Sequence, residues 1–338
     1  MTDTVHLSLE EVHALARDAL RRLGCSEPQA GAIADTVTAA ERDECQSHGL
    51  FRIPFYARVI ATGRPDPRAE PEISELAPAV ARVDGRMGFA PLALQRGAAP
   101  LAERARSQGI AALSVNNVFH IAALWPEVER LAEQGLVAFA FTGAINYVAP
   151  AGGTRPLFGT NPMAFAWPRE NGPPVVFDQA SSVSARGEIQ IRRRDGVSLP
   201  AGWAVGPDGA PTTDPDIALK GAQLPFGGHK GSAIAMMVEL LAGALIGDLF
   251  SYEAGERDAD GTGAPQGGEL MIAIDPARCT AGGEATASLG HAEQLFSRIL
   301  EQEGTRLPSQ RRVDARRRTL TAGVEVPRSL VERIGALG

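Results

Sequence analysis

The fold is decided by the stretch GIAALSVNNVFHIAALWPEVERLAEQGLVAFAF, residues 109–141. An apolar run at 110–115 precedes a segment of helical periodicity at 121–134, and a second apolar run follows at 136–141. Short apolar runs rich in Val, Ile and Phe predict strands, whereas apolar side chains three and four residues apart predict a helix. Strand, helix and strand in succession are typical of an α/β protein.

The flanking sequence extends this alternation in both directions. Upstream we predict a strand at 79–83 and a helix at 89–108. Downstream, a Gly- and Pro-rich region carries closely spaced apolar runs, which predict antiparallel additions and hence a mixed sheet. Those runs lie at 163–167, 175–177 and 188–191, and they are followed by a buried helix from Ser232, a strand at 269–274, a helix at 287–302 and a helix after Pro327.

Helices are also predicted at the N-terminal end. Ser8 and Glu11 form a capping box for a first helix that ends at Gly24. A second helix begins near Ser26 and ends before the polar cluster 41–48. Pro54 is expected to break or kink the segment that follows.

Composition places the chain among globular proteins. Its 338 residues are 44% hydrophobic and 22% charged, and the length suggests about two domains. A net charge of −7 gives no footprint for nucleic acid, and the basic run 311–318 is expected to be a solvated or cofactor-side helix face.

The remaining composition points to a cytoplasmic protein. Three distant cysteines indicate reduced thiols, and residues 1–7 have no export pattern. The apolar stretch 232–247 is too short to span a bilayer and contains Glu239. We therefore expect neither nucleic acid nor a membrane as a partner.

Several common catalytic motifs are absent. No Gly-x-Gly-x-x-Gly follows a strand, and Lys230 does not stand in a phosphate-binding P-loop. The pair Cys45 and His48 supplies at most two ligands, so we expect no metal site. No Gly-x-Ser-x-Gly is present for serine hydrolysis.

Ser47-His48-Gly49, with Arg52 a turn further on, is the candidate catalytic group. An imidazole with an unperturbed pKa near ~6.5 exchanges protons at neutral pH, and a guanidinium binds a carboxylate with two hydrogen bonds. The alternative is a hydrogen-bonded surface His beside a structural Arg.

A set of motifs in fixed order resembles the second family of malate and L-lactate dehydrogenases. They are CQSHGLFR at 45–52, GTNPMAF at 159–165, ARG at 185–187, GGHKG at 227–231 and ELLAG at 239–243. Within that family, HIAALWPEVE at 120–129 and RLPSQRR at 306–312 look most like the Δ1-piperideine-2-carboxylate/Δ1-pyrroline-2-carboxylate reductases.

The resemblance implies an α/β, non-Rossmann NAD(P)-binding fold with a mixed, largely antiparallel sheet, which would explain the missing glycine motif. It implies a helical module at 1–63, joined by 285–338, and a cofactor- and substrate-binding body at 64–284. It also implies a homodimer and an oxidoreductase of amino-acid metabolism that uses NADPH, with NADH as the alternative.

The resemblance also implies roles for individual residues. His48 would be the proton donor, with Ser47 and Glu188 in a relay, and Arg52 and Thr160 would contact the substrate. Relatives are expected to carry Asp at the position of Glu188, whose side chain is one methylene longer. The implied cofactor-binding residues are His120, Ile121, Ala122, Ala123, Leu124, Asp178, Gln179, Ala180, His229, Lys230, Gly304, Thr305, Arg306, Leu307, Pro308 and Ser309.

Physical arguments fit several of these positions, and each has a simpler alternative. The amides of 121–124 are expected to open a helix and bind a pyrophosphate, although His120 could instead cap that helix. The segment 227–231 places flexible backbone and a cation before a helix, or it is only a Gly-rich helix entry. Thr160 could stand in a turn, and Asp178 could merely end a strand.

The implied reaction is NADPH-dependent reduction of the C=N bond of a cyclic imine carboxylate, which converts Δ1-piperideine-2-carboxylate to L-pipecolate or Δ1-pyrroline-2-carboxylate to L-proline. One alternative is an NAD(P)-dependent dehydrogenase of 2-hydroxy acids such as malate, lactate or ureidoglycolate. A second alternative is a non-catalytic protein that keeps only the cofactor site.

Overall fold

The computed structural model describes residues 3–338, and internal contacts divide them into two compact units. The first unit runs up to Ala140 and includes Ala164–Phe177 and Met271–Gly338. The second comprises Phe141–Met163 and Asp178–Leu270. The boundaries of these two units differ from those of the predicted domains, 1–63 and 64–284. The domain boundary derived from the resemblance stays a prediction.

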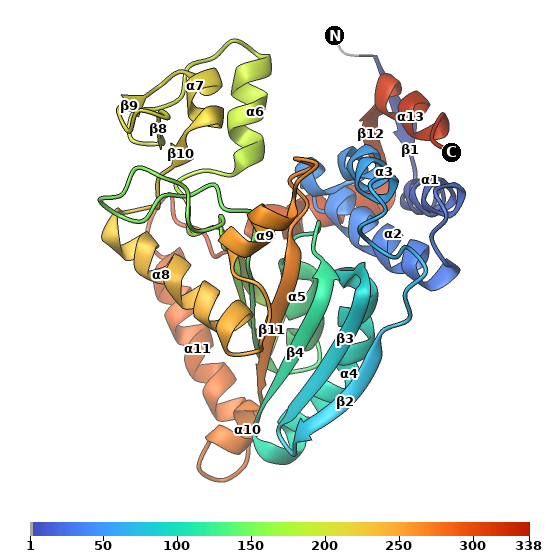
Figure 1. Cartoon of the computed structure of the whole chain (residues 1–338). Coiled ribbons are helices and arrows are strands. Elements are labelled where there is room, and N and C mark those ends of the chain that lie inside the picture. Colours follow the sequence, from blue (N-terminus) through green and yellow to red (C-terminus); the bar gives the residue numbers. More distant parts are fainter. Residues whose placement is uncertain (1–2) are drawn as a thin grey trace. The chain divides into compact units, whose positions relative to one another are not determined.

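A mixed sheet lies mostly in the first unit (Figure 1). β2 pairs antiparallel with β3, whereas β3 and β4 run parallel, which confirms the α/β class and the mixed sheet. Within the described residues, the strand order is β2 (Glu72–Ala77), β3 (Val80–Phe89), β4 (Ile110–Phe119), β11 (Gln266–Ile274), β5 (Val137–Thr142), β6 (Met163–Trp167) and β7 (Val175–Gln179).

Helix α4 (Ala90–Gln108) packs directly on β3 and β4, as its apolar periodicity predicts. Gly97 makes this close approach possible, because a Cβ atom there would lie 2.4 Å from a methyl group of Leu113. Val83, Leu101 and Leu113 are fully buried in the resulting core. Burial of such side chains is the main stabilising contribution at this interface.

The predicted N-terminal helices are α1 (Leu9–Arg22) and α2 (Glu27–Arg42). Ser8 and Glu11 form the predicted capping box, and the Ser26 side chain caps α2. Pro54 does not break a helix. It lies in the first turn of α3 (Ile53–Ala61), where a missing N–H leaves no hydrogen bond unmade.

The two ends of the chain pack together within the first unit. β1 (Thr4–Leu7) pairs antiparallel with β12 (Val324–Pro327). Helix α13 (Arg328–Gly335) contacts α1, and α12 (Gln310–Ala322) contacts α2. In contrast, α11 (Ala285–Leu300) buries Phe296 against Val175 and Leu307, next to β7.

Further sequence-based predictions were wrong. The segment 188–191 is not a strand but part of α6 (Arg186–Arg194), where Glu188 and Arg192 form an ion pair one helical turn apart. Helix α5 (Trp125–Ala132) begins at Trp125 and not at residue 121, because Pro126 fits only its first turn. Residues 121–124 therefore precede the helix, and the prediction that their amides open it was also wrong.

The second unit contains a small sheet and several helices (Figure 1). The predicted buried helix is α8 (His229–Glu239), which continues into a π-helical turn, η3 (Leu240–Ala244). No helix among residues 3–338 is long and apolar enough to cross a membrane. The other elements of this unit are β8 (Ala204–Val205), β9 (Pro211–Thr212), β10 (Ala222–Gln223), α7 (Pro215–Lys220) and α9 (Ser251–Arg257); α10 (Pro276–Cys279) belongs to the first unit.

Candidate active site

His48 lies where two short 3₁₀ turns meet. The turns are η1 (Gln46–His48) and η2 (Leu50–Arg52), and Gly49 separates them. Nδ1 of His48 is 3.0 Å from Oγ of Ser47, so one of the two groups donates a hydrogen bond to the other. The structure therefore places Ser47 and His48 in contact, as the resemblance implied.

A buried carboxylate that the sequence analysis missed holds this loop. Glu41 Oε1 accepts a 2.7 Å hydrogen bond from the backbone N–H of Leu50. A Cβ atom on Gly49 would lie 2.1 Å from the same oxygen, so only glycine fits between the carboxylate and the loop. Burial raises the pKa of Glu41, although the Leu50 N–H partly offsets this effect.

Arg52 is fixed beside His48 by the backbone. Its Nε donates a 2.7 Å hydrogen bond to the carbonyl oxygen of Ser47, and its guanidinium lies 5.8 Å from the ring centre of Phe55. Because Nε is used in this way, the two terminal nitrogens are placed to meet a carboxylate.

The environment of His48 changes its expected protonation. Burial, together with the neighbouring charges of Arg52 and His120, lowers the pKa of His48 to about 3. The imidazole is therefore neutral at neutral pH, unlike a solvated histidine. It can accept or donate a hydrogen bond, but it does not carry a charge.

The residues 120–124 form an irregular segment between β4 and α5. His120 is 7% exposed, and its charge contributes to the lowered pKa of His48. Ile121, Ala123 and Leu124 are buried, whereas Ala122 is partly exposed. The first unit thus brings this predicted cofactor segment close to the candidate catalytic histidine.

Trp125, the next residue, contacts the candidate catalytic histidine directly. Its ring centre lies 6.3 Å from that of His48, with the planes at 85°, an edge-to-face contact. Its Nε1 donates a 3.3 Å hydrogen bond to Oδ2 of Asp43 at the end of α2. Sequence reasoning quoted Trp125 within a motif but gave it no role.

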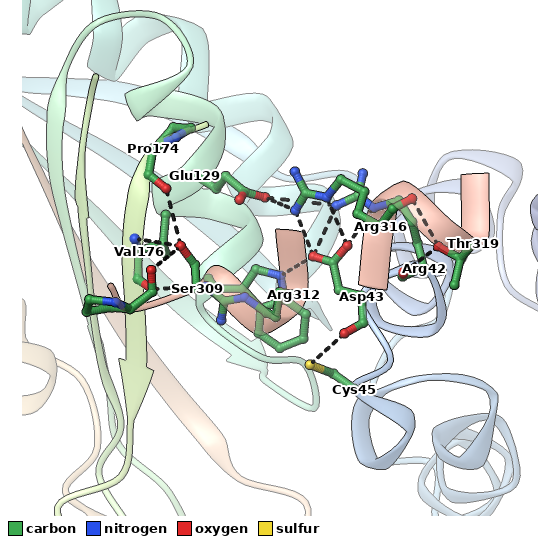
Figure 2. A network of polar contacts seen from close by, with 12 residues as sticks. Arg42, Asp43, Cys45, Glu129, Pro174, Val176, Ser309, Arg312, Arg316 and Thr319 are labelled. Carbon is green, nitrogen blue, oxygen red and sulfur yellow. Dashed lines mark hydrogen bonds and ion pairs between the residues drawn. The ribbon is translucent and has the colours of Figure 1, made fainter. Parts of the chain in front are cut away.

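The predicted C-terminal cofactor segment, 304–309, is attached to β7 through Ser309 (Figure 2). Oγ of Ser309 lies 3.3 Å from the backbone nitrogen of Val176, which donates to it, and 3.3 Å from the carbonyl oxygen of Pro174. Leu307 is buried against Val175, and Arg306 is exposed. Residues Gly304, Thr305 and Pro308 are exposed as well.

In the second unit, Ser181 joins three predicted segments. Its N–H and its hydroxyl both donate to the carbonyl oxygen of Thr160, at 2.8 and 3.0 Å. Its own carbonyl accepts from the N–H of Phe226, just before the glycine-rich entry to α8. A Cβ atom on Gly231 would lie 2.3 Å from the carbonyl oxygen of Phe226, so this turn requires glycine.

The second unit therefore brings together Thr160, the segment 178–180 and the start of α8. Asp178 is half-buried and Gln179 is exposed at the end of β7, and Ala180 precedes Ser181. His229 and Lys230 are exposed in the first turn of α8. Gly227 and Gly228 before them have φ angles of 56° and 62°, which favour glycine.

A buried hydrogen-bond network holds Asn161, the residue that follows Thr160. Asn161 is fully buried, and its Nδ2 donates to Oε1 of Glu239 at 2.8 Å. The N–H of Ser251 donates to the other carboxylate oxygen of Glu239, and its hydroxyl donates to Asn161. Glu239, the charged residue within the apolar stretch 232–247, therefore fixes the loop that contains Thr160 and Asn161.

Glu188 lies in the second unit, in the first turn of α6. Its Oε1 is 3.0 Å from Nε of Arg192, and its side chain is 41% exposed. Because Ser47 and His48 belong to the first unit, a relay that includes Glu188 stays a prediction.

The described residues contain no cluster of three or more His, Cys, Asp or Glu side chains that could hold a metal ion. Arg306, His229 and Lys230 are exposed cationic or ionisable groups on predicted cofactor segments. Arg306 belongs to the first unit, and His229 and Lys230 belong to the second; cationic groups of this kind bind phosphates.

The chain belongs to the malate/L-lactate dehydrogenase family, whose model matches residues 7–335. This is a family of oxidoreductases that act with a nicotinamide cofactor. Among curated relatives, a Δ1-pyrroline-2-carboxylate reductase of Ancylobacter novellus is 51% identical over 338 residues, which is all of this chain and 99% of the relative. A Δ1-pyrroline-2-carboxylate/Δ1-piperideine-2-carboxylate reductase of Pseudomonas aeruginosa is 52% identical over 98% of this chain and 99% of the relative.

A solved structure is similarly close. The crystal structure of Δ1-piperideine-2-carboxylate reductase from Pseudomonas syringae has a TM-score of 0.93 and 42% identity. The match covers 99% of this chain and all of that one. The similarity extends over both units, so it confirms the fold class and the family inferred from the motifs.

Proposed function

We propose that this protein reduces the C=N bond of cyclic imine carboxylates with NADPH. The observation that supports this proposal most strongly is the identity of about half of all positions, over the whole chain, with relatives named Δ1-pyrroline-2-carboxylate reductase. The contact of Ser47 with His48, and of Arg52 with the same loop, supplies the polar groups that such a reaction needs.

Arg52 is the residue proposed to bind the ring carboxylate. Its terminal nitrogens form a planar fork that matches a carboxylate, and its Nε is fixed by the Ser47 carbonyl. Thr160 is proposed as a second substrate contact, held by Ser181 and by the network around Asn161.

His48 is proposed to hold the proton on the ring nitrogen. A neutral His48 that donates from Nδ1–H to Ser47 Oγ has a lone pair on Nε2, which can accept a hydrogen bond from the N–H of a protonated imine. The protonated C=N carbon is then a strong hydride acceptor, and the product nitrogen keeps the same proton.

The cofactor when bound supplies the hydride. The residues proposed to hold it are the segment 120–124 and the segment 304–309 in the first unit, and 178–180, His229 and Lys230 in the second. Arg306 and Lys230 are the candidate partners for a 2′-phosphate, and they are the basis for proposing NADPH over NADH. A homodimer in the cytoplasm is part of the same proposal.

The proposal is tested by following NADPH consumption with Δ1-pyrroline-2-carboxylate and Δ1-piperideine-2-carboxylate beside pyruvate, oxaloacetate and phenylpyruvate. We expect the cyclic imines to have the highest kcat/KM. Faster reduction of a straight-chain 2-oxo acid would instead support the 2-hydroxy acid dehydrogenase suggested by the family description. Tight NADPH binding without turnover of any of them would support a non-catalytic protein.

A further inference from the structure

We propose that Trp125, held by Asp43, is a positioning residue for His48 and for the predicted cofactor segments of the first unit. This inference rests on the proposed function, which supplies the roles of those segments. Trp125 is 4% exposed, and its indole meets parts of the chain that are far apart in sequence.

The first contact is with His48. The two rings meet edge to face, with 6.3 Å between centres and 85° between planes. Such pairs prefer this angle because the ring edge is positive and the face negative. His48 lies on a loop of 3₁₀ turns and not on a regular helix, so a rigid indole against it restricts the orientation of its imidazole.

The second contact fixes the indole itself. Asp43 is fully buried, and its Oδ2 accepts from Nε1 of Trp125 at 3.3 Å. The carboxylate cannot move to another partner, because Arg316 binds both of its oxygens, at 3.0 and 2.7 Å, and Arg42 binds it from its own helix. Figure 2 shows Asp43 enclosed by these two guanidinium groups.

The third contact reaches the C-terminal cofactor segment. The guanidinium of Arg312 lies 5.0 Å from the ring centre of Trp125, within the range of a cation–π interaction. Nη2 of Arg312 also donates to the carbonyl oxygen of Val176, the residue whose N–H binds Ser309 (Figure 2).

Trp125 is therefore linked to all three predicted site segments of the first unit, namely the loop with His48, the segment 120–124 and the segment 304–309. It contacts His48, it directly follows the segment 120–124, and it packs against the helix that begins after 304–309. A displacement of about 1 Å at a reacting group costs up to about 10²-fold in rate, so loss of this support should appear in turnover.

The test replaces Trp125 with Phe in the full chain. Phe keeps an aromatic face for Arg312 but removes the N–H that binds Asp43. We expect kcat for the cyclic imine to fall about tenfold, with its KM within about twofold of wild type. Trp125→Leu removes the ring as well and should lower kcat by about 10²-fold.

Trp167→Phe is the matched control. Trp167 lies in β6 of the same unit, and its buried Nε1 has no hydrogen-bond partner among the described residues. Because no hydrogen bond is lost there, we expect kcat to stay within about twofold of wild type. Unchanged kcat in Trp125→Phe, or an equal loss in Trp167→Phe, would overturn the inference.

A second measurement does not depend on turnover. Diethyl pyrocarbonate labels histidine, and mass spectrometry of the peptides reports the labelling rate of His48 alone. Release from the indole should raise that rate severalfold in Trp125→Phe and leave it unchanged in Trp167→Phe. If the wild type reduces no cyclic imine, the proposed function fails, whereas equal labelling rates in wild type and Trp125→Phe would refute the positioning role separately.

Discussion

Arg316→Met removes the centre of the buried ion cluster at the end of α2. Arg316 makes two hydrogen bonds to Asp43 and one, at 2.7 Å, to Glu129. The side chains of Asp43 and Glu129 are 0% and 6% exposed, so water cannot replace the lost partner. Arg42 still binds Asp43 at 2.8 Å, but its contact with Glu129 is only at 3.9 Å, so Glu129 is the carboxylate that loses its close cation.

The expected loss is large for a single substitution. Breaking a buried ion pair by removing one partner costs about 3–5 kcal/mol of unfolding free energy, because a buried charge is left unpaired. For 338 residues, an unfolding entropy of ~2.1 cal/mol/K per residue gives about 0.7 kcal/mol/K. We therefore expect Tm to fall by about 4–7 °C.

Arg318→Met, on the same helix, is the control for helix propensity and total charge. Arg318 pairs with Glu44 at 2.8 Å, but both side chains are about half exposed. An exposed pair contributes about 0–1 kcal/mol, so its loss should change Tm by at most about 1.5 °C. Both variants remove one Arg from the same helix, but only Arg316→Met breaks buried ion pairs.

The direction in which the unfolding free energy changes with pH tests the same argument. Burial tends to raise the pKa of Asp43, but hydrogen bonds from Arg316 and Arg42 outweigh it and hold the pKa below 3.8. In the wild type, the ionised Asp43 stabilises the fold fully at pH values above the pKa that its carboxyl group has in the unfolded chain. This stabilisation is lost as the pH falls through the lower pKa of Asp43 in the folded protein. Without Arg316, Asp43 keeps only Arg42 as a close cation, so burial should raise its pKa above that in the wild type, and protonation in acid should relieve part of the lost stability.

Urea unfolding at pH 7 and pH 5 measures both effects. We expect the stability difference between wild type and Arg316→Met to be smaller at pH 5. A difference below about 1 kcal/mol at pH 7, or one that grows as the pH falls, would refute the buried-pair argument.

Three further predictions concern the candidate site. His48→Ala should lower kcat by at least about 10²-fold while NADPH binding, measured by fluorescence titration, stays within about threefold. Arg52→Lys should chiefly raise the KM for the imine, by about tenfold in initial-rate assays, because an ammonium group does not form a bidentate fork. Glu239→Gln should lower the unfolding free energy by about 1–3 kcal/mol in urea titrations, because the amide cannot accept all the hydrogen bonds that the carboxylate accepts from Asn161 and Ser251. An unchanged kcat in His48→Ala, an unchanged KM in Arg52→Lys or an unchanged unfolding midpoint in Glu239→Gln would contradict the respective assignment.

Features that depend on neighbouring positions in the sequence could be predicted, and the proximity of the candidate residues is one of them. Ser47, His48 and Arg52 lie within six positions of one another, and the structure brings all three into one loop. The capping box at Ser8 and the α/β alternation were also predicted, because both depend on spacing along the chain.

Residues that act across long sequence separations could not be identified in this way. Glu41 holds the loop by accepting a hydrogen bond from the N–H of Leu50. Because every residue except proline has a backbone N–H, such a contact cannot be predicted from the residue types. Asp43 and Arg316 are 273 positions apart. The error at α6 has a different cause, because Ile189 and Ile191 alternate with polar residues as in a strand, yet only Ile189 is buried. There the ion pair from Glu188 to Arg192 supports a helix.

The neutral state of His48 bears on which substrate the site suits. Sequence alone suggested an imidazole that exchanges a proton near neutral pH, whereas burial and the charge of Arg52 lower its pKa to about 3. Reduction of a C=O group creates an alkoxide, which needs a proton from an acid that is charged or readily ionised. A protonated C=N group already carries that proton, and it needs only a neutral acceptor to hold its N–H in place. A neutral His48 beside Arg52, the residue proposed to bind the ring carboxylate, is therefore compatible with a protonated cyclic imine, whose N–H it would accept.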